Sequence, residues 1–309
     1  MKDISVVIPV YNSSENLDEL YKQLKDALQS IAYEIIFVDD CSSDNSWGEI
    51  CRMAQIDSTI TAVGLRKNSG QDNALMAGFS YAEGNYICIM DDDLQHSPYD
   101  IPALYEQCRK GYDVCYAGFS RKEQKLWKNT GSWLNGVFAQ FLLKKPKGIY
   151  MSPFKMVKRD VIQEVIQYTG PFPYIDGLLL QLTNSLTSVK VQHHKRFKGK
   201  GNFNFIRSVS LFLKIMTSFS VIPLRLATIT GFVTSFIGFL LAVYYMFEYF
   251  LNQHRVEGWA SLIISLLIIG GLLLMSMGLI GEYIGRIFIT LNGKPQYSVR
   301  KVIRTGSDH

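Results

Sequence analysis

The sequence has little that would suit a zinc-binding or disulfide-bonded protein. Its five cysteines are scattered along the chain, at Cys41, Cys51, Cys88, Cys108 and Cys115. They form no CxxC pair, and no histidines stand at the spacing of a zinc site. An odd, scattered set is typical of free thiols in a reducing compartment. The apolar run in MKDISVVIPVYN is too short for a signal peptide. We therefore expect the N-terminal two-thirds of the chain to face the cytoplasm.

The chain also lacks a strong imbalance of charge. Its formal net charge is +5 over 309 residues, which supports neither nucleic-acid binding nor a basic tail. In contrast, 48% of the residues are hydrophobic and only 19% are charged. The apolar excess lies after about residue 205, and this uneven distribution predicts a composite architecture.

The first part of the chain alternates short apolar runs with amphipathic stretches. Strands rich in valine and isoleucine are predicted at Ile4–Val10, Ile35–Val38, Thr61–Leu65, Tyr86–Met90 and Val114–Ala117. Helical spacing between them indicates βαβ units. We therefore predict an α/β domain over residues 1–200, with a mostly parallel sheet and helices on both faces.

A membrane-associated part is predicted to follow this domain. Residues 201–222 have the pattern of an amphipathic helix lying in the membrane interface, and a helix packed on the domain is the alternative. Residues 223–290 contain two apolar segments, at about 226–250 and 259–281. Within them, Ala227–Phe247 and Trp259–Ile280 carry no charged residue, and each has the roughly 20 residues needed to span a bilayer. Their short joining loop predicts a transmembrane hairpin, which leaves residues 291–309 as a tail.

Charges beside the hairpin predict its orientation. Basic residues flank its outer ends, whereas the joining loop carries only Arg255. The positive-inside rule then places both termini in the cytoplasm, so that the protein is a multi-pass protein of the bacterial inner (plasma) membrane. The glycines of the second span are interpreted as helix-packing positions. Self-association through these helices is left open.

Three acidic or polar clusters follow predicted strands, within PVYNSSEN, VDDCSSDNS and MDDDLQHSP. Open α/β sheets bind their ligands at the carboxyl ends of such strands. Asp91 and Asp93 form a DxD arrangement, in which two carboxylates can face one point. Hard cations such as Mg²⁺ or Mn²⁺ take oxygen ligands of this kind together with substrate phosphates. His96 is read as a loop residue rather than as a ligand.

These motifs resemble glycosyltransferase family 2, whose members have the GT-A (Rossmann-like) fold. The resemblance rests on VVIPVYN, IIFVDDCSSDNS, LRKNSGQDNALMAGF and IMDDDLQHSP, which occur in that order. The C-terminal hairpin is similar to that of the polyprenyl-phosphate glycosyltransferases, a group that includes dolichol-phosphate mannose synthases. Residues 1–200 would then be a cytoplasmic GT-A domain.

The resemblance implies roles for particular residues. Pro9, Tyr11 and Asp40 match positions around the nucleotide base and ribose, and Asp39 belongs to the same motif. Asp91 and Asp93 match the aspartates that face the metal and the diphosphate, with Gln95 near the donor sugar. Lys67, Asn68 and Gly70 match the segment that closes the nucleotide pocket.

The chain departs from the family pattern in three places, one of which is SSEN, where Glu15 is the only acidic residue. KRFKGKGNFNF resembles a basic segment that approaches the phosphates, which assigns Arg196, Lys198 and Lys200 to the acceptor phosphate, although Gly201–Phe203 differ from the family. A solvated basic face is the alternative for this segment. Asp176 stands where many relatives carry arginine, and its role is left open.

The resemblance implies an inverting, metal-dependent transfer of a sugar from a nucleotide-sugar, a UDP-sugar by expectation, to undecaprenyl phosphate or a related lipid. Such a product would supply cell-surface glycan synthesis. The sequence identifies neither the sugar nor the base, and it does not decide whether a general base exists. A processive polysaccharide synthase is a second interpretation, but its Gln-x-x-Arg-Trp motif is absent. Another glycan acceptor and a non-catalytic nucleotide-binding membrane scaffold are the remaining alternatives.

Overall fold

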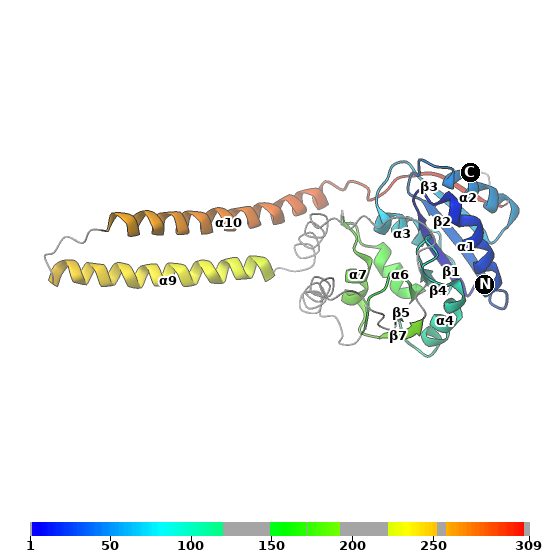
Figure 1. Ribbon diagram of the computed structural model, residues 1–309, viewed down its shortest axis with the longest axis horizontal. Coiled ribbons are helices and arrows are strands. Elements are labelled where there is room, and N and C mark those ends of the chain that lie inside the picture. The colour runs from blue at the N-terminus through cyan, green and yellow to red at the C-terminus, as the bar shows by residue number, and fades with distance from the viewer. Residues whose placement is uncertain (1, 120–148, 171, 192–221, 252–257, 306–309) are drawn as a thin grey trace. The chain divides into compact units, whose positions relative to one another are not determined.

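The computed structural model describes residues 2–119, 149–170, 172–191, 222–251 and 258–305. The chain divides into two units (Figure 1). The first comprises Met1–Asn204 together with Gly293–His309, and the second comprises Phe205–Asn292. The predicted interfacial helix at 201–222 and the basic residues Arg196, Lys198 and Lys200 lie outside the described residues, apart from Ile222, which begins a long helix.

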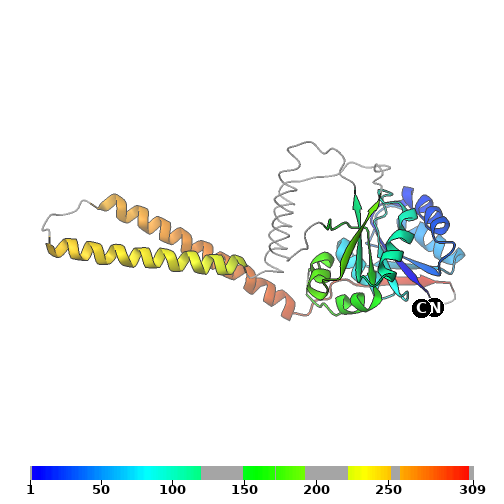
Figure 2. The same cartoon turned by 90° about the horizontal axis from the view of Figure 1, so that it is seen from below.

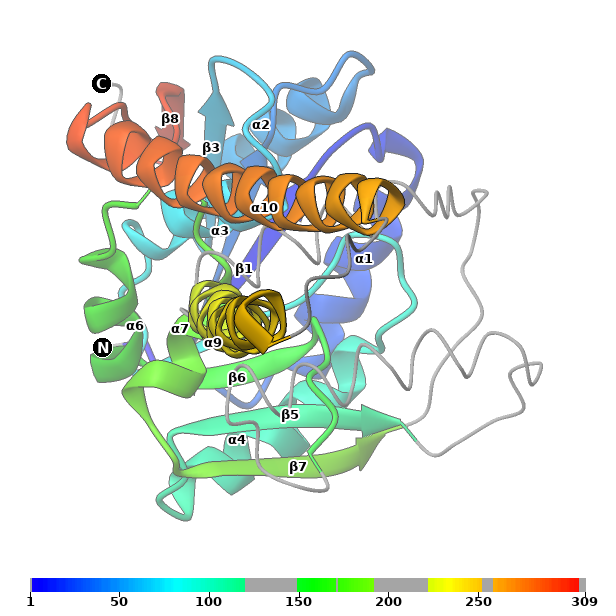
Figure 3. The same ribbon diagram turned by 90° about the vertical axis from the view of Figure 1, so that its left-hand side faces the viewer.

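The described residues of the first unit form an eight-stranded sheet in the order β7-β5-β6-β4-β1-β2-β3-β8. The strands are β1 (Ile4–Val10), β2 (Tyr33–Asp39), β3 (Ile60–Leu65), β4 (Tyr86–Ile89), β5 (Val114–Phe119), β6 (Lys155–Lys158), β7 (Leu186–Val191) and β8 (Val299–Arg304). Strands β6 and β8 run antiparallel to their neighbours, and all other pairs are parallel. Strand β8 lies beside β3 at one end of the sheet and β7 lies at the other end (Figure 3). The prediction of a mostly parallel α/β sheet is confirmed.

Helices α1 (Ser14–Ala27), α2 (Ser46–Ile56) and α4 (Ile101–Arg109) cover one face of the sheet. Their apolar side chains, such as Leu20, Ile50 and Leu104, join one buried cluster with Val6 and Phe37 of the strands. Figure 2 shows the sheet from a second side, with helices along it. The apolar periodicity of these helices therefore marks the face that packs on the strands.

Helix α3 (Gln71–Phe79) lies on the opposite face, where α6 (Arg159–Ile166) and α7 (Ile175–Leu182) also pack. Gly78 lets α3 approach the strands closely. A Cβ atom at this position would lie 2.4 Å from Cγ1 of Val7 and 2.9 Å from Cγ2 of Val38. This close contact fixes α3 against the sheet, so that its first residue, Gln71, is held at the sheet edge.

Strand β8 was not predicted from the sequence. At the C-terminus, the sequence left residues 291–309 as a tail, and the structure adds β8 to the sheet there. The central strands β1 to β5 lie where the sequence predicted them, within one or two residues.

The second unit contains helices α9 (Ile222–Leu251) and α10 (Trp259–Leu291). Each has a segment long and apolar enough to cross a bilayer, at Leu224–Leu241 and Ile268–Leu291. Large apolar side chains such as Phe232 and Leu274 are more than 70% exposed. Exposed apolar surface of this extent is unfavourable in water and favourable in the hydrocarbon core of a bilayer. The helices extend beyond the predicted spans of 226–250 and 259–281.

Several polar side chains among the described residues of these helices have a partner within their own helix. Thr228 and Thr234 donate from their hydroxyls to backbone carbonyls four residues earlier, at 2.9 and 2.5 Å. Near the end of α10, Arg286 pairs with Glu282 at 2.8 Å. Hydrogen bonds within the helix are the usual way to accommodate hydroxyls in hydrocarbon. The few polar groups of the hairpin are therefore compatible with membrane insertion.

Candidate active site

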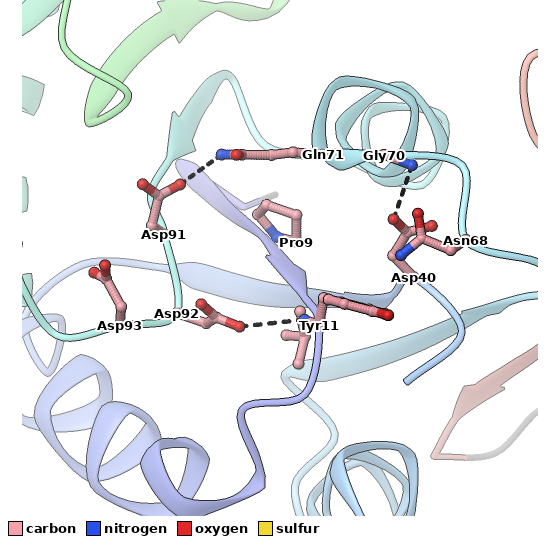
Figure 4. A pocket seen from close by; sticks show the side chains of 10 residues that line it. Pro9, Tyr11, Asp40, Asn68, Gly70, Gln71, Asp91, Asp92 and Asp93 are labelled. Carbon is pink, nitrogen blue, oxygen red and sulfur yellow. Dashed lines mark hydrogen bonds between the residues drawn. The ribbon is translucent and has the colours of Figure 1, made fainter. Parts of the chain in front are cut away.

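The loops after four parallel strands meet at one edge of the sheet and line a cavity of about 350 Å³ (Figure 4). The lining residues are Pro9, Val10, Tyr11, Asp40, Asn68, Gly70, Gln71, Asp91, Asp92 and Asp93. They come from the ends of β1, β2 and β4 and from the segment that joins β3 to α3. Carboxyl ends of parallel strands necessarily face the same edge, which is where α/β sheets bind ligands.

The backbone takes unusual conformations where three of these loops begin. Asn12, Cys41 and Leu94 have φ values of 54°, 59° and 57°, in the left-handed region. This region costs non-glycine residues on the order of 1–3 kcal/mol each. Each residue follows a strand that leads to the cavity. The surrounding contacts must therefore hold these turns in place, and such strain is common at functional sites.

The polar residues of VDDCSSDNS hold the neighbouring loop after β1. The hydroxyl of Ser42 accepts a hydrogen bond from the Asn12 amide at 3.0 Å, and the Asp44 carboxylate accepts one from the Ser14 amide at 3.0 Å. Hydrogen bonds from Ser46 and Ser14 keep the pKa of Asp44 below its usual value despite its burial. These contacts satisfy amides at the start of α1, as a helix cap does, from a different loop.

Asp40 fixes the segment that closes the other side of the cavity. Its carboxylate accepts hydrogen bonds from the amides of Ser69 and Gly70, at 2.6 and 2.9 Å. Burial raises the pKa of Asp40, and these two amide hydrogen bonds work against that rise. Gly70 has a φ of 89°, a conformation that favours glycine. Asp40 and Gly70 thus shape the cavity together.

The three aspartates after β4 are not equivalent. Asp91 accepts a hydrogen bond from the side-chain amide of Gln71 at 2.7 Å, and Asp92 accepts one from the backbone amide of Tyr11 at 3.4 Å. Figure 4 shows Asp92 pointing toward Tyr11, whereas Asp91 and Asp93 lie on the other side of the segment. Asp93 also accepts a hydrogen bond from the Gln95 amide at 3.1 Å. Asp92 therefore joins the loop after β4 to the loop after β1. The carboxylates of Asp91 and Asp93 lie on the other side of the segment, away from Tyr11 (Figure 4).

The electrostatics of this cluster favour a cation. Burial, followed by the charges of Asp93 and Asp92, raises the pKa of Asp91 to about 6. Crowded carboxylates of this kind are unfavourable until positive charge compensates them. Within the described residues, no group of three or more histidine, cysteine, aspartate or glutamate side chains has the arrangement of a metal site. Two carboxylates that share a cation with substrate phosphates suit Mg²⁺ or Mn²⁺, which keep non-protein ligands.

Most of the predicted site residues meet at the cavity. Pro9, Tyr11, Asp40, Asn68, Gly70, Asp91 and Asp93 line it. Asp39, Lys67 and Gln95 are not among the lining residues. Asp39 is 1% exposed and accepts a hydrogen bond from the Ser42 amide at 3.2 Å. The roles assigned to all the predicted site residues, whether they line the cavity or not, stay predictions, as do those of the basic residues outside the described ranges.

A buried ion pair between β6 and α7 was not predicted. The ammonium of Lys155 on β6 pairs with the carboxylate of Asp176 on α7, and the Tyr116 hydroxyl donates to the same carboxylate oxygen at 3.0 Å. The side chain of Lys155 is 4% exposed and that of Asp176 is 15% exposed. A lysine within the apolar run FKMV, which packs into the core, requires such a partner. A lysine inside an apolar run was therefore the signal in the sequence from which a buried ion pair could have been predicted.

This ion pair lies in a group of charges that reaches the cavity. Burial raises the pKa of Asp72 to about 6, the charge of Lys155 opposes this rise, and Asp176 adds to it. The charge of Lys155 likewise works against the rise in the pKa of Asp91. The backbone amide of Ile175, at the start of α7, also works against the rise in the pKa of Asp72, at the start of α3. Lys155 therefore compensates several carboxylates at once.

The described residues form a mostly parallel α/β sheet with an acidic cavity at its carboxyl edge, which is where open α/β sheets bind their ligands. Residues 5–166 match the family described as glycosyl transferase family 2. The chain belongs to this family and is a glycosyltransferase. Residues 222–287 match a second family, the GtrB C-terminal hairpin, and GtrB is a polyprenyl-phosphate glycosyltransferase.

Solved structures have the same fold. The glucosyl-3-phosphoglycerate synthase of Mycobacterium tuberculosis in complex with uridine-diphosphate is 17% identical, with a TM-score of 0.51, and the match covers 71% of this chain and 79% of that chain. The same enzyme in complex with Mn²⁺, UDP-Glc and phosphoglyceric acid gives 17% identity, a TM-score of 0.51, and coverage of 71% and 78%. At this identity the likeness concerns the fold, and the GT-A architecture expected from the sequence is confirmed.

Proposed function

We propose that this chain transfers a sugar from a nucleotide-sugar, a UDP-sugar in the first instance, to a polyprenyl phosphate such as undecaprenyl phosphate. The observation that carries this proposal is the presence, in one chain, of an acidic cavity within a family 2 domain and of a GtrB-type hairpin. The cavity suits a nucleoside diphosphate with its cation, and the hairpin suits an enzyme whose acceptor is a lipid.

The reaction exchanges one phosphate ester of the sugar for another. The bond between the anomeric carbon and the diphosphate breaks, and its electron pair leaves with the diphosphate. An oxygen of the lipid phosphate forms the new bond from the opposite face of the ring, which inverts the anomeric centre. A phosphate monoester has a second pKa of about 6, so the acceptor is already anionic at neutral pH. The attack therefore needs no general base.

The residues of the cavity prepare the site for the donor. Asp91 and Asp93 would hold Mg²⁺ or Mn²⁺, which when bound neutralises charge on the departing diphosphate. Gln71 keeps the Asp91 carboxylate in place through its 2.7 Å hydrogen bond. Asp40 orders the amides of Ser69 and Gly70 at the nucleotide side. The complex of the related fold with Mn²⁺ and UDP-Glc supports this assignment of donor and cation.

The path of the chain supports an orientation with the catalytic domain and both termini in the cytoplasm. The chain leaves the first unit before α9 and re-enters it at Gly293. Because β8 pairs with β3, the hairpin must begin and end on the side of the membrane where the domain lies. Arg225 lies near the start of α9, Arg286 near the end of α10 and Lys294 just after it, and basic residues at these outer ends favour the cytoplasmic side.

A donor panel tests the proposed function. Purified full-length protein in detergent would be incubated with undecaprenyl phosphate, Mn²⁺ and radiolabelled UDP-, GDP- or dTDP-sugars in turn. We expect one donor to give radioactivity that partitions into the organic phase, and EDTA to abolish this signal. Intact protein that binds nucleotide and transfers from no donor would instead favour the non-catalytic scaffold.

A further inference from the structure

The chain returns to the catalytic domain after the hairpin and completes the sheet. Strand β8 pairs antiparallel with β3, with Thr61 opposite Arg304 and Val63 opposite Val302. Without β8, β3 would be an edge strand with unpaired backbone groups. The segment 294–305, called here the C-terminal strap, includes β8 and belongs to the first unit.

The far end of the strap is fastened by Arg304. Its guanidinium donates to the Thr61 hydroxyl at 3.0 Å, to the Glu83 carboxylate at 2.9 Å and to the Tyr81 carbonyl at 2.9 Å. The hydroxyl of Thr305 donates to the carbonyl of Ala54 at 2.7 Å. A planar guanidinium with three acceptors is a geometrically specific contact. The strap therefore has a defined register on the sheet.

The near end of the strap reaches the segment that closes the cavity. The Arg66 amide donates to the carbonyl of Ser298 at 2.8 Å. Arg66 directly precedes the residues that lead to Ser69 and Gly70, whose amides bind Asp40. The strap thus holds one end of this segment, and Asp40 holds the other.

Two side chains of the strap extend this contact to the surrounding elements. The Tyr297 hydroxyl lies 3.1 Å from the Ser80 hydroxyl, directly after α3. The side-chain amide of Gln296 donates to the carbonyls of Tyr168 and Gly170, at 2.7 Å each. Helix α3 begins with Gln71, the partner of Asp91. The strap therefore contacts the segment before α3 and the residue after it.

We infer that the C-terminal strap is a positioning element of the donor site, which keeps the 66–70 segment in the conformation that binds nucleotide. The inference rests on the proposed function, because it takes the cavity to bind a nucleoside diphosphate. No strap residue lines the cavity, so the strap acts through Arg66 and α3 rather than by contact with the donor. Without it, the binding segment would have to be ordered when nucleotide binds, and that cost would weaken affinity.

Two truncations of the full-length chain test this inference. One ends at Gly293 and lacks the strap, and the matched control ends at Thr305 and lacks only residues 306–309. The dissociation constants of UDP and GDP would be measured with Mn²⁺ by calorimetry in detergent. We expect at least a tenfold weaker binding, about 1.4 kcal/mol, in the first truncation only. A synthetic peptide of residues 294–305 should restore the affinity.

Point variants provide a test that does not depend on the folding of the truncated chain. The double variant Gln296→Ala/Tyr297→Phe removes the side-chain contacts at the near end of the strap, and Thr305→Val removes one at its far end. We expect severalfold weaker nucleotide binding in the double variant and unchanged binding in Thr305→Val, even if both lower the melting temperature equally. If folded strap variants bind nucleotide as tightly as the intact chain does, the inference about the strap is wrong, and the proposed function is unaffected. An intact chain that binds neither UDP nor GDP would contradict the proposed function and the inference with it.

Discussion

Asp93→Asn is expected to abolish sugar transfer while the protein remains folded and inserted in the membrane. The substitution keeps the shape of the side chain and removes one of the two adjacent carboxylates that would hold the cation. Loss of a group that stabilises developing charge costs roughly 10²–10³-fold in rate, and loss of the metal itself costs more. The rate of lipid-linked product formation measures this effect, and membrane flotation checks insertion.

Asp92→Asn is the matched control for this experiment. Asp92 accepts a hydrogen bond from the Tyr11 amide, and an asparagine oxygen can accept the same bond. We expect Asp92→Asn to keep transfer within about tenfold of the parent, because one neutral hydrogen bond contributes roughly 1 kcal/mol. Equal activity in Asp93→Asn and the parent would remove the metal hypothesis. Equal and complete losses in both variants would show that the three aspartates act as one cluster.

Lys155→Met is expected to cause the largest loss of stability. It removes the buried ammonium that pairs with Asp176 and whose charge also acts on Asp72 and Asp91. Removal of one partner from a buried ion pair costs about 3–5 kcal/mol, since the other charge stays buried. For a domain of this size, that corresponds to a fall of roughly 10 °C in melting temperature. A thermal shift of the full-length protein in detergent measures it.

The double variant Lys155→Met/Asp176→Leu separates the charge effect from lost packing. A well-packed apolar pair can replace a buried ion pair at little cost, although the Tyr116 hydroxyl would lose its acceptor. We therefore expect the double variant to be more stable than Lys155→Met. A double variant that is less stable than both single variants would contradict the assignment of the ion pair as the source of the effect.

The central part of the fold could be predicted because its strands are buried on both faces. Strand β1 is fully buried, so its sequence is apolar except for Ser5, and the strand has the same bounds as the predicted one. The acidic residues after β4 were also predicted to meet the residues after β1, since parallel strands end at one edge. Local pattern and topology were sufficient for these elements.

The remaining features depend on contacts between distant parts of the chain. Strand β8 has the sequence VRKVIR, which is half basic, and its partner β3 lies more than 200 residues earlier. A sequence pattern does not specify such a pairing. The partners of Lys155 and Asp92 could not be predicted for the same reason, because burial imposes a partner without identifying it. The predicted role of Asp40 next to the base did not include its hydrogen bonds to Ser69 and Gly70.

The most direct test of the account compares three acceptors with the active donor: undecaprenyl phosphate, undecaprenol and 3-phosphoglycerate. The lipid alcohol keeps the chain without the phosphate, and the soluble acid keeps a phosphate without the chain. We predict that only undecaprenyl phosphate gives product. This product would be an organic-soluble, acid-labile, lipid-linked sugar phosphate of inverted anomeric configuration. Transfer to 3-phosphoglycerate or to undecaprenol, with none to undecaprenyl phosphate, would contradict this prediction.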